Sequence, residues 1–423
     1  MTKQKQELRW GYSTGACAAA IAAASWLCHE KNPSQAPSIS ELLLHFLDGQ
    51  SQLVPLLPKG TVEDYIAIQK DGGDDPDCTH KAIIYGSLEP VSTTELEQVA
   101  TQDYVIHFDA DGHIITSQTT DFLSISSYTT VIIQAIEGIG LCTRIGLDCD
   151  QGKWAINTGP RAMIALNLAK AGLHAGSHCG PWLLRLGVQD GEKISRHTLN
   201  KQLGIMGGIS ILGTTGHVRP YSHDAYIATV RICVQSNAMT GGRHMVFCTG
   251  GRTMRGARAL YPYLPETAFV CMGDFIAESL VAADKHGMHE VTVACMAGKL
   301  CKYAAGFEYT HAHTVAQDMD LLRKVIAEQV SAIELSTQGR NGHEQNSQVL
   351  NFSDDFHTAP TVREALLHLP NHLRLTVLKG LAQQALKIFA ERCHASCLRL
   401  AVFDFDGSFL FSSEQQGNEV IPQ

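Results

Sequence analysis

The sequence lacks any apolar run long enough to cross a membrane, and its first ten residues lack the apolar core of a signal peptide. It also has few charges: 18% of its 423 residues are charged, whereas 44% are hydrophobic. This much apolar material can build sizeable cores, which argues against a disordered chain. The net charge of −9 does not favour a nucleic-acid partner. We therefore expect a folded cytoplasmic protein of about two or three domains that binds neither membrane nor nucleic acid.

Ligand sets with the spacing of a metal site are also lacking. The thirteen cysteines form no C-x-x-C pair, and no cluster of residues has zinc spacing. Many of the cysteines lie in apolar surroundings, as reduced thiols of cytoplasmic proteins do. The lysine-serine/threonine signature of a P-loop is absent, which disfavours a phosphate-handling enzyme. The sequence therefore predicts no protein metal site.

What the chain does have is a segment rich in glycine, Leu203–Gly216, with aliphatic residues, hydroxyls and almost no charge. Glycine is costly inside regular structure, so this backbone must turn sharply or admit a close approach. The commoner explanation is a buried strand that ends in a tight turn. The alternative is a ligand site. Its candidate residues are Gly207, Gly208, Ser210, Thr214 and Thr215.

The loop Lys70–Thr79 crowds four carboxylates onto one glycine-proline turn, namely Asp71, Asp74, Asp75 and Asp77. Neighbouring like charges raise one another's pKa, and a carboxylate with a raised pKa can accept a proton near neutrality. The commoner explanation is a solvated acidic turn, and the alternation of a calcium loop is missing. Both interpretations stay open, with the four aspartates as candidate catalytic residues.

Cations are frequent near the glycine-rich stretches, and arginine forks suit carboxylates. The candidates are Arg161, Arg185, Lys193, Arg196, Lys201 and Arg219. A charged hydrogen bond is worth roughly 1.5–3 kcal/mol, so such a cluster could hold a small anionic ligand on an acidic protein. Glu137–Thr143 is a near miss to the dinucleotide fingerprint, and we interpret it as a strand-ending turn that could line a ligand site.

Residues 1–235 are expected to form a mixed α+β domain. Ser13 or Thr14 can cap an alanine-rich helix that runs to about Cys28. Pro160 opens a second helix, Arg161–Leu173, because proline suits the first helical position. The expected strands are Leu42–Leu47 and Leu53–Leu57, which form a hairpin, Val131–Ile136, and Ala225–Val234.

Residues 236–423 repeat strand, glycine turn and helix, which favours a parallel, doubly wound α/β domain. The expected strands are His244–Cys248, Ala268–Met272, Glu290–Cys295 and, near the end, Leu398–Phe405. The expected helices include Arg255–Tyr261, Phe275–Lys285 and one after Lys299. The polar stretch Gln338–Phe356 is expected to be a long loop.

Ligands in open α/β sheets lie at the carboxyl ends of the strands. The candidate residues there are Gly250, Gly251, Gly273, Asp274, Gly298 and Lys299. Asp274 could accept hydrogen bonds from ribose hydroxyls, although capping a helix is the commoner role of such an aspartate. The two histidines of Thr310–His313 lack a third ligand, so we expect His311 to line a polar site rather than bind metal.

Several motifs occur in the order typical of one family. Gly11–Ala18 resembles G-Y-T-T-G-x-C-A, and Lys70–Thr79 resembles K-D-x-G-D-D-x-D-x-T. Further matches are Ala155–Arg161 to A-I-N-x-x-P-R, Thr198–Gly216 to T-x-N-x-R-L-G-I-x-G-G-I-S-I-x-G-T-T-G, and Gly298–Gly306 to G-K-L-x-K-x-A-A-G, followed by T-H at Thr310-His311. Together they resemble the CbiD family, the cobalt-precorrin-5B (carbon-1) methyltransferases, over nearly the whole chain.

This resemblance implies a mixed α+β domain likened to ribosomal S5 domain 2, followed by a parallel α/β domain. It implies methyl transfer from S-adenosyl-L-methionine to carbon 1 of cobalt-precorrin-5B, which gives cobalt-precorrin-6A in anaerobic cobalamin biosynthesis. Cobalt then arrives within the corrinoid substrate, whose acetate and propionate groups suit the cations above. A homo-oligomer is compatible with this expectation.

The resemblance also implies roles for single residues. The substrate-binding residues would be Thr14, Asn157, Arg161, Asn200, Gly207, Gly208, Ser210, Thr214, Thr215 and Arg219. The donor-binding residues would be Gly250, Gly251, Gly273, Asp274, Gly298, Lys299 and His311. The chain departs from the family pattern at some positions, for example at Cys295-Met296, where the family usually has glycine-histidine. These departures leave open an alternative, a non-catalytic corrinoid-binding paralogue.

Overall fold

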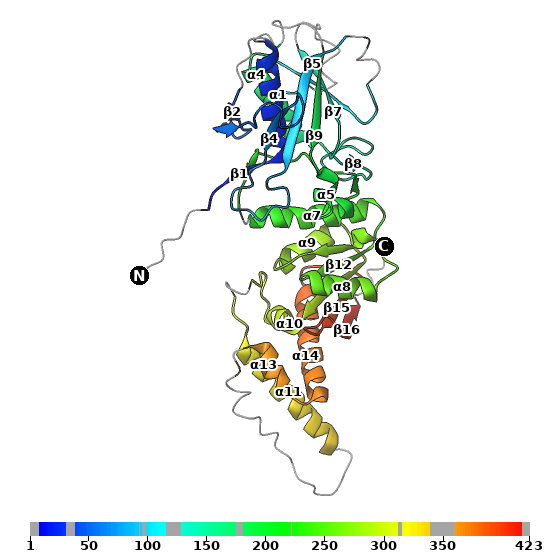
Figure 1. Ribbon diagram of the computed structural model, residues 1–423. Coiled ribbons are helices and arrows are strands. Elements are labelled where there is room, and N and C mark those ends of the chain that lie inside the picture. Colours follow the sequence, from blue (N-terminus) through cyan, green and yellow to red (C-terminus); the bar gives the residue numbers. More distant parts are fainter. Residues whose placement is uncertain are drawn as a thin grey trace, which may run out of the picture. The chain divides into compact units, whose positions relative to one another are not determined.

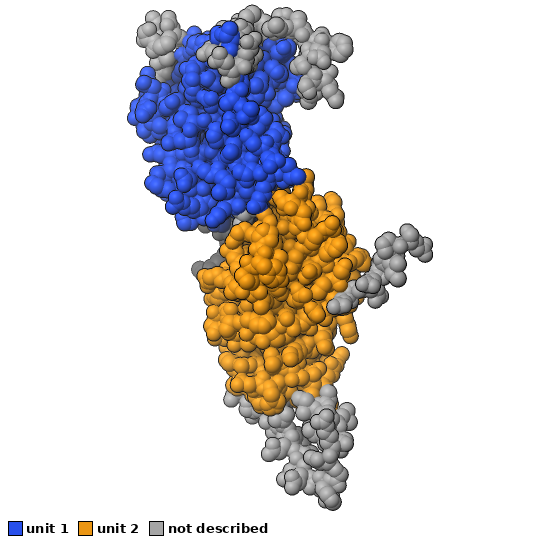
Figure 2. All heavy atoms as spheres, turned by 90° about the vertical axis from the view of Figure 1, so that its right-hand side faces the viewer, with its two compact units in different colours: residues 1–222 blue, residues 223–423 orange. Residues whose placement is uncertain are grey.

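The computed structural model describes residues 8–30, 39–92, 94, 99–115, 128–174, 181–220, 222–311, 315–338, 359 and 361–416 (Figure 1). It divides into two compact units, residues 1–222 and 223–423, coloured separately in Figure 2. Each unit contains its own five-stranded sheet. No helix in the described part of the chain is long and apolar enough to cross a membrane.

The sheet of unit 1 has the strand order β4-β5-β9-β7-β6. Its strands are β4 (Ile66–Gln69), β5 (Ile83–Pro90), β9 (Trp182–Val188), β7 (Thr129–Ala135) and β6 (Tyr104–Phe108). Neighbouring strands are antiparallel except β7 and β9, which run parallel. Strand residues such as Ile84, Ile133 and Leu186 are fully buried. The strand expected at Val131–Ile136 is confirmed as β7.

Two helices, α1 (Thr14–Glu30) and α4 (Thr158–Lys170), pack side by side, and α1 also packs on β4 and β5 (Figure 1). α1 is buried without interruption from Thr14 to Trp26. Its alanines allow this because they favour helix and occupy little space. Both helices were expected, although α4 begins three residues earlier than expected, at Thr158, so that Pro160 lies in its first turn.

Two-stranded ribbons complete the described part of unit 1. The expected hairpin is confirmed as β2 (Glu41–His45) and β3 (Ser51–Pro55). The remaining elements are β1 (Gly11–Tyr12), which pairs with β11 (His217–Val218), β8 (Leu141–Cys142), which pairs with β10 (Ile205–Met206), and the short helices α5 (Gly191–Ser195) and α6 (Asn200–Leu203). The ribbons with β10 and β11 hold the two ends of the glycine-rich segment.

The sheet of unit 2 has the order β13-β12-β14-β15-β16. The strands are β12 (His244–Cys248), β13 (Phe269–Cys271), β14 (Glu290–Met296), β15 (Cys397–Phe403) and β16 (Phe409–Gln416). β12 to β15 run parallel and β16 is antiparallel to β15. The four expected strands are confirmed as β12 to β15. β16 was not expected, because its polar sequence suits only a solvent-facing edge.

In unit 2, α7 (His223–Met239) precedes β12, and the other described helices lie between the strands β12 and β15. They are α8 (Gly251–Leu260), η2 (Glu266–Ala268), α9 (Ile276–Lys285), α10 (Ala297–Ala304), α11 (Met319–Gln338), α13 (Val362–Leu367) and α14 (Asn371–Ala390). The helices expected after β12, β13 and β14 are confirmed as α8, α9 and α10. Of the expected loop Gln338–Phe356, only Gln338 is described, and it ends α11.

One expected strand, Ala225–Val234, is wrong, because these residues lie inside α7. The β-branched residues of the run suggested a strand, but its buried residues include Val230, Cys233, Val234 and Asn237. That spacing of three, four and seven residues is helical. Because α7 belongs to unit 2, the unit boundary lies between Ser222 and His223 rather than between residues 235 and 236.

The contact between α4 and the glycine-rich segment gives a stability prediction. Alanine normally improves on glycine in a helix by about 0.5–1 kcal/mol, but a Cβ on Gly159 would lie 2.4 Å from the carbonyl O of Gly213. We expect Gly159→Ala to lower the free energy of unfolding of unit 1 by about 1–3 kcal/mol, measured by denaturant titration. The control is Gly251→Ala in the first turn of α8, where no neighbouring described atom lies within 4 Å. Destabilisation by both variants alike would contradict the prediction.

Candidate functional site

Three of the predicted substrate-binding side chains brace the glycine-rich segment from inside. The hydroxyl of Thr14 donates to the carbonyl O of Ser210 at 3.0 Å and accepts the N–H of Leu212 at 2.9 Å. Asn200 donates to the carbonyl O of Gly208 at 2.9 Å and accepts the hydroxyl of Ser210 at 3.4 Å. Thr14, Asn200 and Ser210 are buried. They fix the path of the segment rather than present their polar atoms to solvent.

Of the other predicted residues of this segment, Gly208 is buried against Gly138, and the rest lie on its outer side. Gly207, Thr214, Thr215 and Arg219 are exposed. The guanidinium of Arg219 lies 5.9 Å from the ring centroid of Trp10, whose ring is half exposed. Thr215 accepts the N–H of Leu47 on its carbonyl O at 3.2 Å, which holds the segment against the β2–β3 hairpin. This outer side offers hydroxyls, one cation and an aromatic face to solvent.

Asn157 and Arg161 lie at the start of α4. Asn157 is the N-cap residue, and its N–H donates to the carbonyl O of Ile211 at 3.0 Å. The guanidinium of Arg161 stacks over the ring of Tyr104, 4.1 Å from its centroid. Of the remaining predicted cations, three pair with nearby carboxylates: Arg185 with Glu89, Lys193 with Asp190 and Arg196 with Glu192. The fourth, Lys201, is exposed on α6.

The acidic loop is held by Arg9, which the sequence analysis did not single out. The Arg9 guanidinium pairs with the carboxylate of Asp71, and the Arg9 N–H donates to Asp74 at 2.7 Å. The hydrogen bond from Arg9 is the largest cause that lowers the pKa of Asp71, which stays below its usual range. A second missed residue, His80, accepts the N–H of Gly72 at 3.0 Å.

Asp77 pairs with a buried lysine on the other side of the loop. Lys70 Nζ lies 2.6 Å from the carboxylate, and the Lys70 side chain is 2% exposed. Burial opposes ionisation of Asp77, but attraction to Lys70 and hydrogen bonds from Lys70 and Thr79 lower its pKa overall. The expectation that crowding raises these pKa values is therefore wrong for Asp71 and Asp77, because each carboxylate contacts a cation.

β1 joins the acidic loop to the glycine-rich segment. The N–H of Tyr12 donates to the carbonyl O of Asp71 at 2.8 Å, and Gly11 pairs with Val218 in β11. A Cβ on Gly11 would lie 2.3 Å from the Asp71 carbonyl O, so only glycine permits this approach. On the far side of the loop, the Cys78 thiol donates to the carbonyl O of His197 at 3.1 Å. The structure thus brings the two sequence-predicted loops of unit 1 together.

In unit 2, the candidate residues lie where the strand connections diverge. From β12 the chain passes to β13 on one side, and from β14 it passes to β15 on the other. Ligands of open α/β sheets bind at such a switch point, beyond the carboxyl ends of the strands. Gly250 and Gly251 follow β12 there, at the start of α8. Within the described structure, no neighbouring atom lies within 4 Å of a Cβ built on either glycine.

Asp274 and Lys299 form the centre of a polar network. They follow β13 and β14, the two strands that flank β12 in the sheet. Lys299 Nζ pairs with the Asp274 carboxylate and donates to the hydroxyl and carbonyl O of Thr310 at 2.7 and 3.0 Å. Thr310 is fully buried, and Lys302 donates to its carbonyl O at 2.9 Å. The N-cap of α9 is Phe275, so the carboxylate of Asp274 binds Lys299 rather than capping that helix.

The other predicted residues of unit 2 surround this network. Gly273 precedes Asp274 in the left-handed region, with φ +59°. Gly298 precedes Lys299, and a Cβ there would lie 2.7 Å from the Gln317 side chain. The His311 ring lies parallel to that of Tyr309, with centroids 6.0 Å apart. The structure therefore places all the predicted donor-binding residues beyond the carboxyl ends of β12, β13 and β14.

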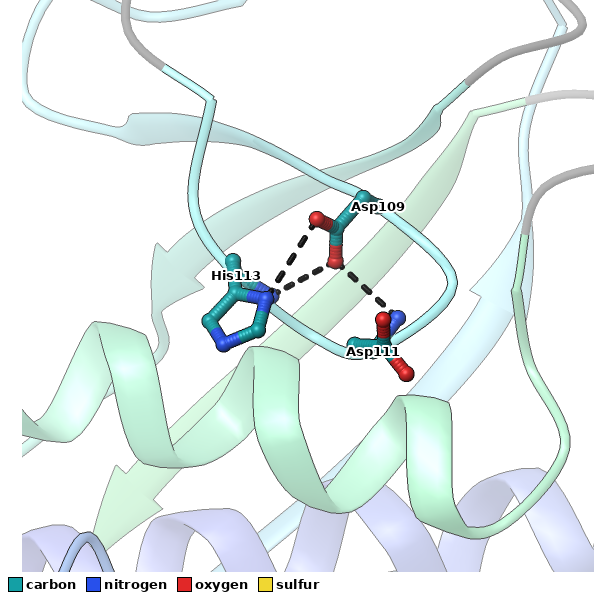
Figure 3. Close-up of side chains that lie close together, drawn as sticks. All are labelled: Asp109, Asp111 and His113. Atoms are coloured by element: carbon teal, nitrogen blue, oxygen red, sulfur yellow. Dashed lines mark hydrogen bonds and ion pairs between the residues drawn. The ribbon is translucent and has the colours of Figure 1, made fainter.

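A further group that the sequence analysis did not single out lies in the turn after β6, where Asp109, Asp111 and His113 converge (Figure 3). Their ligand atoms lie within 4.8 Å of one another. The Asp109 carboxylate already accepts the backbone N–H groups of Asp111 and His113, at 3.0 and 2.9 Å. This turn accounts for the cluster, and we assign no metal to it. The alternation Asp-x-Asp-x-His was the signal that could have found it.

The Lys70–Asp77 pair gives a pH-dependence prediction. The folded pKa of Asp77 is lowered, so its contribution is present above the unfolded value of about 4 and is lost as the pH falls through the folded value. Asp77→Asn should flatten that part of the pH profile. It should also lower the free energy of unfolding at pH 7 by at least about 2 kcal/mol, because Lys70 keeps a buried charge without a carboxylate.

The measurement is denaturant unfolding between pH 2 and 7 (roughly the range over which carboxylates titrate). Asp111→Asn, at an exposed aspartate in the β6 turn, is the matched control and should keep the wild-type profile. An Asp77→Asn protein as stable as wild type at pH 7 would show that the pair does not stabilise the loop.

Comparison with known proteins identifies relatives along most of the chain. The CbiD family model matches residues 1–220. The cobalt-precorrin-5B C(1)-methyltransferase of Geobacillus kaustophilus is 36% identical over 80% of this chain and 81% of its own. The protein of that name from Dechloromonas aromatica is 32% identical over 95% of this chain and 90% of its own.

A crystal structure of the cobalamin biosynthesis protein cbiD from Archaeoglobus fulgidus also aligns, with 23% identity, a TM-score of 0.34, and coverage of 70% of this chain and 80% of that one. The curated relatives match the chain over both units, at identities and coverages that unrelated proteins do not reach. The chain belongs to the CbiD family.

Proposed function

We propose that this protein transfers a methyl group from S-adenosyl-L-methionine to carbon 1 of cobalt-precorrin-5B, giving cobalt-precorrin-6A in anaerobic cobalamin biosynthesis. Relatives at 32–36% identity carry the name of this C-methyltransferase. Cobalt enters as part of the corrinoid substrate. We also propose that unit 1 has a fold like that of ribosomal S5 domain 2, and that unit 2 is a doubly wound α/β domain.

The main support for a donor site in unit 2 is the order of elements and site residues along β12, α8 and β13. Glycines follow the first strand at the start of a helix, and an acidic residue, Asp274, follows the second strand. Nucleoside ligands use this arrangement, in which the glycines admit the ligand near helix N–H groups and the acid accepts ribose hydroxyls. Within the described residues, the side-chain hydrogen bonds to the Asp274 carboxylate fall on Oδ1. Oδ2 is therefore available to a hydroxyl donor.

Unit 1 suits the corrinoid. Arg219 and Arg161 can bind its carboxylates, Thr214 and Thr215 can orient a side chain through hydroxyls, and the exposed face of Trp10 can pack on a flat ring. In the acidic loop, Asp71 and Asp77 are engaged in their pairs with Arg9 and Lys70, which hold the loop in place. Asp75 is the aspartate that we assign to handle ring protons.

The chemistry itself requires positioning above all. The donor supplies an electrophilic methyl group on a sulfonium, and the ring carbon must lie in line with it at about 3–3.5 Å. The residues of both units therefore act by orienting ligands and excluding water. No residue of the chain needs to become covalently modified, so we assign no nucleophile.

Calorimetry tests the donor site. It measures the binding of S-adenosylhomocysteine, the demethylated donor, with corrinoid present. Asp274→Ala should weaken this binding about tenfold or more, since a charged hydrogen bond is worth roughly 1.5–3 kcal/mol. Asp284→Ala, at an aspartate that pairs with His394, is the matched control and should bind as wild type does. Equal affinity of both variants and wild type would place the donor elsewhere.

The loop assignments of unit 1 predict a loss of turnover without a loss of fold. Asp75→Asn and Thr215→Val should each lower kcat by at least about tenfold, and the exposed positions Asp64→Asn and Thr61→Val serve as controls. The assay incubates enzyme with cobalt-precorrin-5B and donor and detects one added methyl mass. Wild-type rates in Asp75→Asn and Thr215→Val would refute the assignments. A wild-type protein that binds corrinoid without adding the methyl would instead support the non-catalytic paralogue.

A further inference from the structure

Aromatic rings gather around Asp274 in unit 2. Phe275 follows Asp274 directly, and its ring centroid lies 5.2 Å from that of Tyr226 and 5.1 Å from that of Tyr309. His223 lies 5.4 Å from Phe275 and 5.2 Å from Tyr309. These rings come from α7, from the β13–α9 connection and from the segment after α10, so the fold collects them from three separate parts of the sequence. We call Tyr226, Phe275, Tyr309 and His223 the aromatic cluster.

Hydrogen bonds fix the orientation of the aromatic cluster. The Tyr226 hydroxyl donates to the carbonyl O of Cys271, the last residue of β13, at 3.0 Å. The Tyr309 hydroxyl lies 3.2 Å from His223 Nε2. A Cβ on Gly273 would lie 3.2 Å from the Tyr226 hydroxyl. The rings are therefore held against the same turn that carries Asp274.

The aromatic cluster is not part of the interior of unit 2. Tyr226 is 38% exposed and His223 is exposed, while Phe275 and Tyr309 are half-buried. Burial of apolar surface is favourable, by roughly 25 cal/mol per Å², and these ordered rings leave part of theirs in water. A surface of fixed, partly exposed rings beside a hydroxyl acceptor is suited to a flat heteroaromatic ligand.

We propose that the aromatic cluster binds the adenine ring of the methyl donor, an inference that rests on the donor site proposed above. β13 is the edge strand of its sheet. If the ribose binds Asp274, the base attached to it lies next to Asp274. The rings of the aromatic cluster occupy that position. Stacking there needs no base-specific hydrogen bond, because every purine has a flat π-face.

The flat alternative, the corrinoid, fits this surface less well. Its edge carries acetate and propionate groups, but the cations beside Asp274 are already engaged: Lys299 pairs with Asp274, and the buried Lys302 donates to Thr310. A ribose offers neutral hydroxyl donors, which a carboxylate accepts without a charge penalty. The Asp274 carboxylate beside the aromatic cluster therefore favours a nucleoside over the corrinoid.

The test compares dissociation constants for S-adenosylhomocysteine by calorimetry, with corrinoid present. Phe275→Leu should weaken binding about tenfold, since stacking on an aromatic ring is worth roughly 1–3 kcal/mol per base. The matched control is Phe409→Leu, at a phenylalanine on β16, the opposite edge of the same sheet, which is 45% exposed. It should bind as wild type does.

Tyr226→Leu and Tyr226→Phe keep the test decisive if Phe275→Leu does not fold. Tyr226→Leu should weaken binding and abolish the loss of adenine absorbance that accompanies stacking, whereas Tyr226→Phe should retain the ring and that spectral change. Wild-type affinity in both Phe275→Leu and Tyr226→Leu, with binding still weakened by Asp274→Ala, would overturn the adenine surface and leave the donor site in place. Absence of binding by the wild-type protein itself would instead overturn the donor site.

Discussion

The close approach of backbones at glycine is the constraint on which unit 1 depends. Gly15 of α1 and Gly159 of α4 lie so near Pro160 and the glycine-rich segment that a Cβ would meet other atoms at 2.6 and 2.4 Å. The same is true of Gly208, whose Cβ would lie 2.3 Å from the carbonyl O of Gly138. Because protein interiors are close-packed and hard to compress, these contacts fix where the two helices begin. They leave the outer side of the segment, with Thr215 and Arg219, in one defined position relative to the acidic loop.

Ion pairs fix the charged groups of the two candidate sites. The chain is acidic overall, yet the aspartates that matter most contact cations: Asp71 with Arg9, Asp77 with Lys70, and Asp274 with Lys299. In unit 1 these pairs lower the pKa of Asp71 and Asp77. The loop that the sequence presents as a set of repelling acids is therefore held by two salt bridges, which fix Asp71 and Asp77 in place.

Features set by local sequence could be predicted, and those set by distant partners could not. The alanine-rich sequence predicted α1, because helix propensity acts within a few residues. The glycine turns after β12 and β13 likewise predicted the strands and helices of unit 2, because turn chemistry is also local. Ala225–Val234 was read as a strand because its β-branched residues outweighed the helical spacing of Val230, Cys233 and Val234. The partner of Asp71 is 62 residues away in the chain, and Tyr226 is 49 positions before Phe275, so no spacing in the sequence could indicate that Arg9 or Tyr226 belongs to a site.

The two units differ in the charge that their exposed site residues present, and this difference assigns the ligands of the proposed reaction. Unit 1 exposes Arg219, hydroxyls and an indole face, which suit a flat ring that carries many carboxylates. Unit 2 holds the partly buried Asp274 carboxylate, paired with Lys299, beside phenol and phenyl rings, which suit a flat base joined to hydroxyls. Exchange of the two ligands would set carboxylates against Asp274 and would leave Arg219 without an anion. Complementary charge steers a ligand to its partner surface, which supports the proposal that the corrinoid binds unit 1 and the donor binds unit 2.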